Sequence, residues 1–271
     1  MLKVDLHTHT KEDPYDKFFI RYSAKDLIRL AAKQRYDVLS ITLHNRVFFN
    51  QELKDFARKR GILLIPGAEP MVEKKDVLLI NVTNQDLSRI KKLDDLEKLK
   101  DSALVVAPHP FFLTGNCLDR QLINHIDKFH AIEYSHFYTR ALINPLLKFV
   151  AGNARAVEVA RKYHKTIIGT SDVHKLYEFG TTFTWVDSPK RKDDILEAIK
   201  KNRVRLDTRP MSLRLYFKRL FGALTQEGIR GRLILKNHMP DLRKDLFFKR
   251  FKNSQKNKKD NGSSTKAWKS K

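Results

Sequence analysis

Two histidines near the amino terminus, His7 and His9, have the spacing of a metal-binding pair. They follow a β-type run, residues 2–4, and residues two apart on a strand point to the same side. Two neutral imidazoles side by side provide half of a transition-metal site. A His-x-His pair also arises by chance, so a metal site requires further ligands elsewhere in the chain.

Four further apolar runs of strand length lead directly into residues that can bind a metal. The runs cover residues 38–43, 62–68, 104–108 and 166–171. The candidate ligands after them are His44, Glu69, His109, Asp172 and His174. Segments of helical periodicity, such as 24–35 and 51–59, separate the runs. Alternating strands and helices predict a parallel sheet or barrel, with its chemistry at the carboxyl ends of the strands.

Six motifs, in order along the chain, resemble those of the PHP (polymerase and histidinol phosphatase) family. They are Asp5-Leu6-His7-Thr8-His9-Thr10, Ile41-Thr42-Leu43-His44-Asn45, Gly67-Ala68-Glu69, Ala107-Pro108-His109-Pro110, Ala131-Ile132-Glu133 and Gly169-Thr170-Ser171-Asp172-Val173-His174. The resemblance spans residues 1–208 and implies a distorted (β/α)7 barrel that holds two or three divalent metal ions. Family members hydrolyse phosphoesters as phosphatases or exonucleases, and others are domains attached to DNA polymerases.

The ligand types indicate how the first two ions would be held, and the resemblance implies the same arrangement. The set for one ion combines two neutral nitrogens with two carboxylates: His7, His9, Glu69 and Asp172. A glutamate can bridge two ions, so Glu69 is also expected at a second ion together with His109. The last ligand of this second ion is open between Glu133 and His136, with His130 behind them.

A third ion would use His44 and His174 with an acidic residue. The acidic candidates follow His9 in a short turn: Glu12, Asp13 and Asp16. The sequence departs from the family pattern at Leu43, where many members have Asp before the histidine. An apolar side chain cannot hold a ligand or a water, so Leu43 counts against the third ion.

Mixed histidine and carboxylate ligands suit Mn²⁺, Fe²⁺ or Zn²⁺ better than Mg²⁺, which prefers oxygen but stays possible. Such an ion lowers the pKa of bound water from 15.7 to about 7 and so supplies a hydroxide at neutral pH. His109 or His174 is the candidate general acid for the leaving group. Arg46 and Arg140 are the candidate phosphate-binding residues, because a guanidinium can bind phosphate in a bidentate manner.

Length and composition fit one barrel followed by a basic extension. The chain has 271 residues, and its lone cysteine, Cys117, excludes an intramolecular disulfide and fits a reducing cytosol. No apolar stretch approaches the ~18 residues of a membrane span, and Met1 opens a charged strand, so a cytoplasmic protein is expected. Residues 209–252 are predicted to form a basic amphipathic helical extension and residues 253–271 a disordered Lys-rich tail.

The charge of the chain points to a polyanionic partner. The net charge is +23, and from Met211 onward 17 Lys and Arg stand against 4 Asp and Glu. RNA or DNA could bind this tail through its phosphates, while a phosphorylated small molecule or nucleotide is the expected ligand of the barrel. The oligomeric state is left open.

Three classes of function remain, led by a metal-dependent phosphoesterase. The second is a C–N metal hydrolase of the amidohydrolase type, since those enzymes also begin with His-x-His. They typically add two mid-barrel histidines, whereas this chain offers Glu69 at the middle of the barrel. The third is a catalytically silent nucleic-acid-binding protein of the PHP fold, which the largely intact ligand set argues against.

Overall fold

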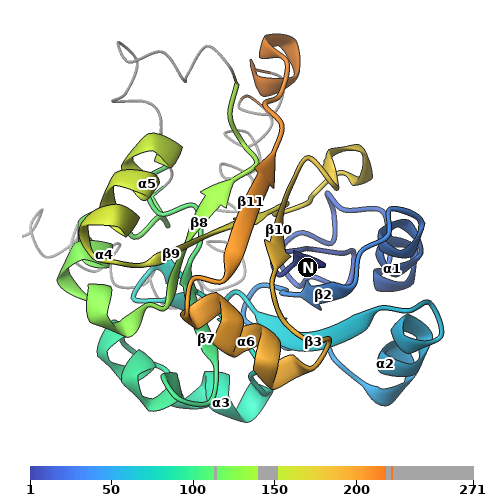
Figure 1. Cartoon of the computed structure of the whole chain (residues 1–271), viewed down its shortest axis with the longest axis horizontal. Helices are drawn as coiled ribbons and strands as arrows, with labels where there is room; N and C mark the ends of the chain where they lie inside the picture. Colours follow the sequence, from blue (N-terminus) through green and yellow to red (C-terminus); the bar gives the residue numbers. More distant parts are fainter. Residues whose placement is uncertain (113–114, 140–151, 218–220, 222–271) are drawn as a thin grey trace, which may run out of the picture. The chain divides into compact units, whose positions relative to one another are not determined.

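The computed structural model describes residues 1–112, 115–139, 152–217 and 221, and Figure 1 shows the elements in chain order. The strands are β1 (Leu2–Asp5), β2 (Val38–Ile41), β3 (Leu63–Ala68), β4 (Met71–Val72), β5 (Lys75–Asp76), β6 (Leu78–Ile80), β7 (Leu104–Ala107), β8 (Ala131–Ser135), β9 (Thr166–Thr170), β10 (Thr182–Val186) and β11 (Val204–Thr208). The helices are α1 (Ala24–Lys33), α2 (Gln51–Arg58), α3 (Asn84–Arg89), α4 (Arg120–Asn124), α5 (Gly152–Lys162) and α6 (Lys192–Lys200), with 3-10 helices η1 (Leu93–Leu99), η2 (Ile126–Lys128) and η5 (Leu176–Glu178).

Nine strands form one sheet that curls into a nearly closed barrel, in the order β11-β10-β1-β2-β3-β6-β7-β8-β9. The runs β1-β2-β3 and β7-β8-β9 are parallel, whereas β6, β10 and β11 run antiparallel to their neighbours. The distorted barrel expected from the sequence is confirmed. Its distortion at β6 has a simple cause: the connection from β3 contains only the β4–β5 hairpin, and a parallel return would need a longer crossover.

The seam of the barrel lies where β9 meets β10 and β11. The amide of Gly169 donates to Thr184 Oγ1 at 2.8 Å, and that hydroxyl donates to the carbonyl of Gly169 at 2.8 Å. A Cβ at position 169 would collide with the side chains of Leu206 and Thr182. Glycine is therefore required here because β10 and β11 pass directly over the backbone of β9.

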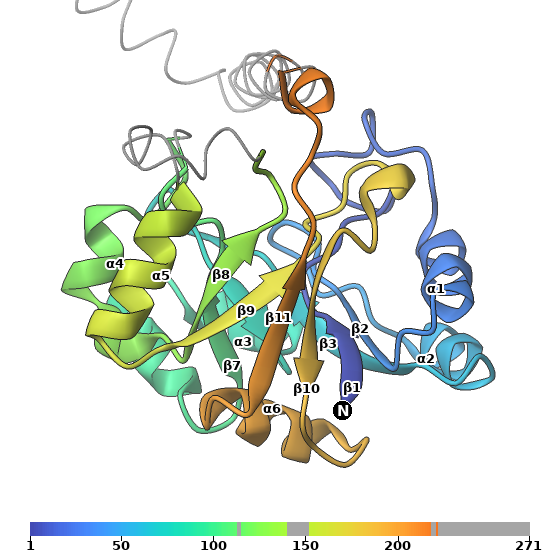
Figure 2. The same cartoon turned by 45° about the horizontal axis from the view of Figure 1, so that its top comes forward.

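Three buried clusters fill the space inside and outside the barrel. Inward residues of the strands, such as Val4, Ile65 and Val106, pack with Ile195 and Ile199 of α6. Figure 2 shows α6 across the end of the barrel where β1, β8 and β9 begin, so this end is closed by a helix. The opposite end, where the parallel strands finish, is the one that carries the candidate ligands.

Alternation along β2 and the residues after it shows how the strands separate interior from helix layer. Leu39, Ile41 and Leu43 pack against α1 and α2, whereas Ser40 and Thr42 are buried on the other face. Leu43 is thus a packing residue of the helix layer. It does not face the ligand cluster. The departure from the family pattern at this position is therefore weaker evidence against a third ion than the sequence alone suggested.

Local signals in the sequence set the beginnings of the outer helices. Ser23 and Asp26 form a capping box at α1, with Ser23 Oγ accepting from the amide of Asp26 at 3.2 Å. Asn50 caps α2 by accepting from the amide of Leu53 at 2.9 Å. The helices predicted over residues 24–35 and 51–59 are both present, ending one or two residues earlier than their apolar pattern.

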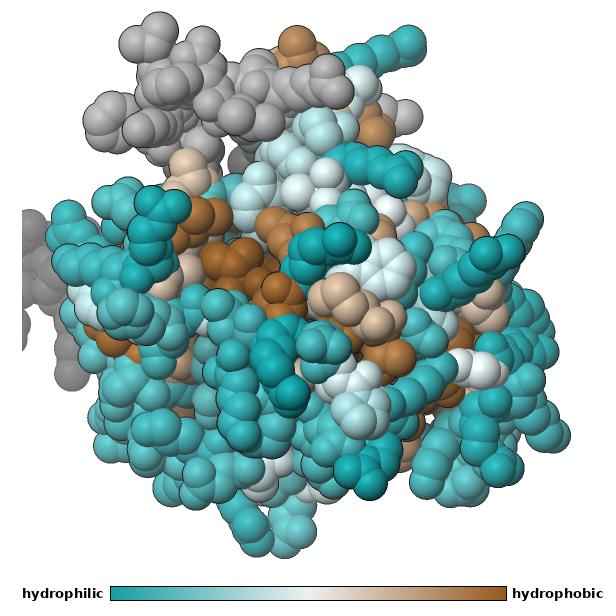
Figure 3. Space-filling model, in the orientation of Figure 1, coloured by the Kyte–Doolittle hydropathy of each residue, from teal (hydrophilic) through white to brown (hydrophobic). Residues whose placement is uncertain are grey.

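The barrel belongs to a compact unit, Met1–Tyr216, and its last strand ends at Thr208. The basic extension and Lys-rich tail predicted for residues 209–252 and 253–271 fall almost entirely outside the described residues. Figure 3 shows one face of the molecule, where hydrophilic residues predominate and hydrophobic ones gather over the strands in its middle. Within the described part of the chain, no helix has the length and apolar character needed to cross a membrane.

Candidate metal centre

The residues after β1 and β9 are held together by the backbone and by one buried carboxylate. Asp5 Oδ1 accepts from the amides of His7 at 3.3 Å and Ser171 at 3.2 Å, while the amide of Asp172 donates to the carbonyl of His7 at 2.9 Å. Burial raises the pKa of Asp5 to about 7. These bonds place the His-x-His segment beside the segment that carries Asp172 and His174.

Four ligand atoms converge at the centre of this end of the barrel, as the sequence predicts for one ion. His7 Nε2 and His9 Nε2 each lie 3.3 Å from Glu69 Oε2 and 3.2 Å from one another. Asp172 Oδ1 lies 3.5 Å from His7 Nε2 and 3.2 Å from His9 Nε2. A tetrahedral shell with bonds of ~2.1 Å has ligand–ligand separations of about 3.4 Å, so these residues fit a divalent ion.

Glu133 reaches this cluster from β8 but lies behind it. Its Oε2 is 2.8 Å from His7 Nδ1, and both side chains are fully buried. A carboxylate on the far nitrogen of a histidine fixes the ring and its tautomer, leaving Nε2 directed at the ion. The sequence treated Glu133 as a candidate ligand, whereas the structure places it as the residue that orients His7, because β8 brings it to the rear of that ring.

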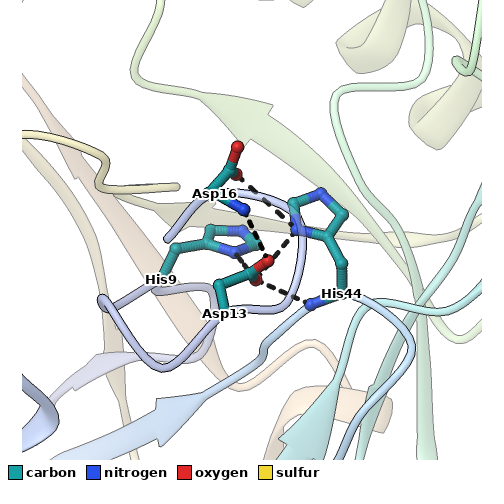
Figure 4. A group of neighbouring side chains, drawn as sticks. All are labelled: His9, Asp13, Asp16 and His44. Carbon is teal, nitrogen blue, oxygen red and sulfur yellow. Dashed lines mark hydrogen bonds and ion pairs between the residues drawn. The ribbon is translucent and has the colours of Figure 1, made fainter. Parts of the chain in front are cut away.

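A second group gathers on the turn after His9, which Figure 4 shows with its partners. Asp13 Oδ2 accepts from the backbone amide of His44 at 2.8 Å and lies 2.9 Å from His44 Nδ1 and 3.2 Å from His9 Nδ1. Asp16 Oδ2 lies 3.7 Å from His44 Nδ1 and 2.9 Å from His174 Nε2. Despite burial, the hydrogen bonds from His44 and His9 hold the pKa of Asp13 far below its usual range. This group fits the third ion.

The structure separates the three acidic candidates of that turn. Asp13 and Asp16 point into the group with His9 and His44. Glu12 does not: its Oε2 accepts from the amide of Ala24 at 3.2 Å, at the start of α1. The prediction of Glu12 as a ligand is therefore corrected, because a carboxylate is stabilised at the positive end of a helix and Glu12 is drawn there.

A third group surrounds the other oxygen of Glu69. Glu69 Oε1 lies 3.2 Å from His109 Nε2, and Asp76 completes a group of three potential ligands. Burial and the charge of Glu69 raise the pKa of Asp76 to about 6. Sequence reasoning missed Asp76 because it lies on the short β5 of the hairpin rather than after a long apolar run. Its only signal was the acidic position directly before the apolar run 77–80.

The other candidates for the second ion lie apart from these groups. His136 is buried directly after β8, but none of the ligand groups formed by the described residues includes it. His130 Nδ1 accepts from the amide of Val105 at 3.0 Å, which is a structural role.

His109 Nδ1 lies 3.5 Å from Cys117 Sγ, so the single cysteine of the chain borders the site without being one of the converging ligands.

Strong mutual electrostatics mark the centre as a place for cations. Burial alone would lower the pKa of His7, but the carboxylates of Glu69, Asp172 and Glu133 outweigh it and raise that pKa to about 10. The facing histidines in turn hold the pKa values of Glu69 and Asp172 well below the usual range. Buried carboxylates and histidines of this kind bind protons or metal ions, because their negative charge would otherwise stay buried without a compensating positive charge.

Backbone strain coincides with the ligands. His109 has φ 28° and Asp172 has φ 40°, a region that side chains with a Cβ rarely adopt. Such residues cost on the order of 1–3 kcal/mol each and persist where the surrounding structure holds them in place. Both strained residues belong to the groups of potential ligands.

Of the two arginines predicted to bind phosphate, the structure describes only Arg46. Arg46 is exposed on the segment after His44, with its guanidinium carbon 5.4 Å from the centroid of the Phe48 ring. Arg140 lies outside the described residues. Lys175 donates to the carbonyl of Phe19 at 2.9 Å and so ties two loops together.

The family model described as PHP-associated matches residues 151–204. An uncharacterized protein of Methanocaldococcus jannaschii is 23% identical over 159 residues, covering 54% of this chain and 92% of that protein. A second uncharacterized protein of that organism is 23% identical over 187 residues, covering 67% of this chain and 69% of its own length.

Solved structures share the fold. A two-domain protein from Bacteroides vulgatus, which contains a predicted PHP-like metal-dependent phosphoesterase, superimposes with a TM-score of 0.55 at 20% identity. That match covers 76% of this chain, and the chain spans 64% of the two-domain protein. PsfC from Pseudomonas syringae gives a TM-score of 0.53 at 17% identity, covering 84% of this chain and 98% of PsfC. The chain therefore shares its fold with these structures, and its residues 151–204 match the PHP-associated model.

Proposed function

We propose that the chain is a metal-dependent phosphoesterase that hydrolyses phosphate monoesters at the carboxyl ends of the barrel strands. The observation that carries this proposal is that the two carboxylate oxygens of Glu69 face different groups of histidines. Its Oε2 faces His7 and His9, while its Oε1 faces His109. A carboxylate with one oxygen toward each of two ligand groups is suited to a pair of ions, an arrangement common in phosphoryl transfer.

Divalent ions held by these groups would polarise the phosphate and lower the pKa of an attacking water. Mn²⁺, Fe²⁺ or Zn²⁺ suits the mixed nitrogen and oxygen ligands. The residues of the chain provide the positions: Glu133 would orient His7, Asp13 would join His9 and His44 at the third ion, and Glu69 has an oxygen toward each of two groups.

His109 and His174 belong to the ligand groups and also reach the solvent. The side chains of His7 and His9 are fully buried, whereas those of His109 and His174 are each 14% exposed. A general acid must come within hydrogen-bond reach of the leaving oxygen. His109 and His174 therefore remain the candidates for protonating the leaving alkoxide.

A metal-reconstitution assay tests the proposal. The protein is stripped with a chelator, reloaded with Mn²⁺, and supplied with an aryl phosphomonoester and, in parallel, a simple amide substrate. Phosphate release that depends on the ion supports the proposal. Ion-dependent amide hydrolysis without phosphate release would instead favour the C–N hydrolase, and neither activity with Mn²⁺, Fe²⁺ or Zn²⁺ would favour the silent binding protein.

A further inference from the structure

Several large apolar side chains of the described residues remain in solvent, and three of the aromatic ones lie within three residues of a candidate ligand. In the described part of the chain, the exposed ones are Met1, Tyr15, Phe18, Met71, Tyr177, Leu213, Phe217 and Phe221. Three of these are aromatic residues on loops that carry candidate ligands. Tyr15 lies between Asp13 and Asp16, Phe18 follows Asp16 by two residues, and Tyr177 follows His174 by three.

Their side chains keep much of their surface in solvent: the exposed fraction is 36% at Tyr15, 68% at Phe18 and 61% at Tyr177. Exposed apolar groups that gather beside a polar site commonly mark a binding surface. The Tyr15 ring lies 5.8 Å from the His44 ring, measured between centroids, so the surface begins directly beside the ligand cluster.

The loops that carry the three rings are fixed to one another. The Tyr15 amide donates to Asp13 Oδ1 at 2.8 Å, which ties this ring to the ligand turn. His174 Nε2 lies 2.9 Å from Asp16 Oδ2, and Lys175 Nζ donates to the carbonyl of Phe19 at 2.9 Å. The segment of Tyr177, in η5, therefore lies against the loop of Phe18, and the two segments form one rim beside the ligand cluster.

Two cations lie near these rings. Lys17 Nζ lies 5.1 Å from the centroid of the Phe18 ring. Arg46, on the loop after His44, has its guanidinium carbon 5.4 Å from the centroid of the Phe48 ring. No described carboxylate forms a salt bridge with either cation. An aromatic ring can stack on a nucleobase, and a cation that is not paired with a carboxylate can bind the phosphate linked to that base.

We infer that Tyr15, Phe18 and Tyr177 form a stacking rim that selects phosphoesters whose organic part carries a nucleobase. The inference rests on the proposed function and specifies its substrate class. The ligand is a nucleoside monophosphate unit, either free or at the 5′ end of a single strand. The scissile phosphate would lie over the ligand cluster, and the adjoining base would stack on the rim.

The test compares substrates that differ only in the base. The Mn²⁺-loaded full chain is given adenosine 5′-monophosphate, ribose 5-phosphate and a short 5′-phosphorylated oligonucleotide, and kcat/KM is measured for each. Variants Phe18→Ala and Tyr177→Ala remove exposed rings. The control is Phe56→Leu on α2, a helix that carries no candidate ligand. The centroid of the Phe56 ring lies 3.6 Å from the guanidinium carbon of Arg60.

Loss of one stacked base contact is expected to lower the preference for the base-bearing ester over ribose 5-phosphate by roughly 5-fold to 100-fold in the rim variants, with no change in Phe56→Leu. A larger effect with the oligonucleotide than with the mononucleotide would identify a nucleic-acid end as the source of the base. Equal kcat/KM for the ester with and without the base in the unmodified chain would overturn the rim while leaving the phosphoesterase intact.

A binding measurement separates the rim from catalysis. Fluorescence anisotropy of a labelled 5′-phosphorylated oligonucleotide is recorded with the same variants, without requiring turnover. Weaker binding by Phe18→Ala and Tyr177→Ala than by Phe56→Leu supports the rim even if no ester is hydrolysed. Identical binding by all of them contradicts it.

Discussion

The contact between Glu133 and His7 leads to a prediction that separates an orienting residue from a ligand. Glu133 Oε2 lies 2.8 Å from His7 Nδ1, in a position that water does not reach. The variant Glu133→Gln keeps the shape of the side chain and an oxygen that can accept from the ring, but it removes the charge. Glu133→Ala removes both the charge and the hydrogen bond.

The magnitude follows from the type of contact. A hydrogen bond to a charged group contributes about 1.5–3 kcal/mol, and a charge-assisted bond is roughly twice as strong as a neutral one. Glu133→Gln is therefore expected to lose about 1.4 kcal/mol, or about 10-fold in metal affinity, and Glu133→Ala about 100-fold.

Competition with a coloured chelator measures the affinity for Mn²⁺ or Zn²⁺ directly, without requiring a substrate. Glu158→Gln is the control, since Glu158 is exposed on α5. Circular dichroism of the metal-free variants shows whether the barrel remains folded. Unchanged metal affinity in folded Glu133→Ala would refute the orienting role and, with it, the view that the ring of His7 is held for an ion.

Three further predictions concern ions and protons. Mn²⁺ at 100 times its Kd is expected to stabilise metal-stripped protein by about 2.7 kcal/mol, seen as a higher melting temperature that a chelator reverses. Asp76→Asn should weaken the second ion by roughly 10-fold, measured as metal content after dialysis. Burial, Lys200 and Lys165 lower the pKa of His130 to about 4 from 6.5, so the unfolded chain binds more protons in this window and stability falls on acidification. Because His130 is partly exposed, His130→Asn should remove only about 1 kcal/mol of that loss, measured by urea unfolding near pH 7 and near pH 5.

The positions of the central ligands could be predicted because they depend on local pattern. An apolar run ends where the strand ends, and the parallel strands all end at one side of the barrel. His7, His9, Glu69 and Asp172 therefore come together although up to 165 residues separate them in the sequence.

The roles of other residues depend on directions that spacing does not give. Both Glu12 and Asp16 follow His9 closely, but only the fold of the turn sends Asp16 to His44 and Glu12 to α1. Glu133 lies at the correct strand for a ligand, yet β8 brings it behind the ring of His7 rather than in front. Asp76 comes from a hairpin inserted between β3 and β6, and short irregular segments carry no periodicity from which to place it.

The most direct test of the central claim is phosphate release by the Mn²⁺-loaded protein and its variant Asp172→Asn, measured side by side. Asparagine keeps the size of the side chain but removes the charge that faces His7 and His9. The control, Asp193→Asn, changes an exposed carboxylate on α6. Loss of at least 100-fold in Asp172→Asn with full activity in Asp193→Asn is predicted. Equal phosphate release by all three proteins would contradict a catalytic ion at the ends of these strands.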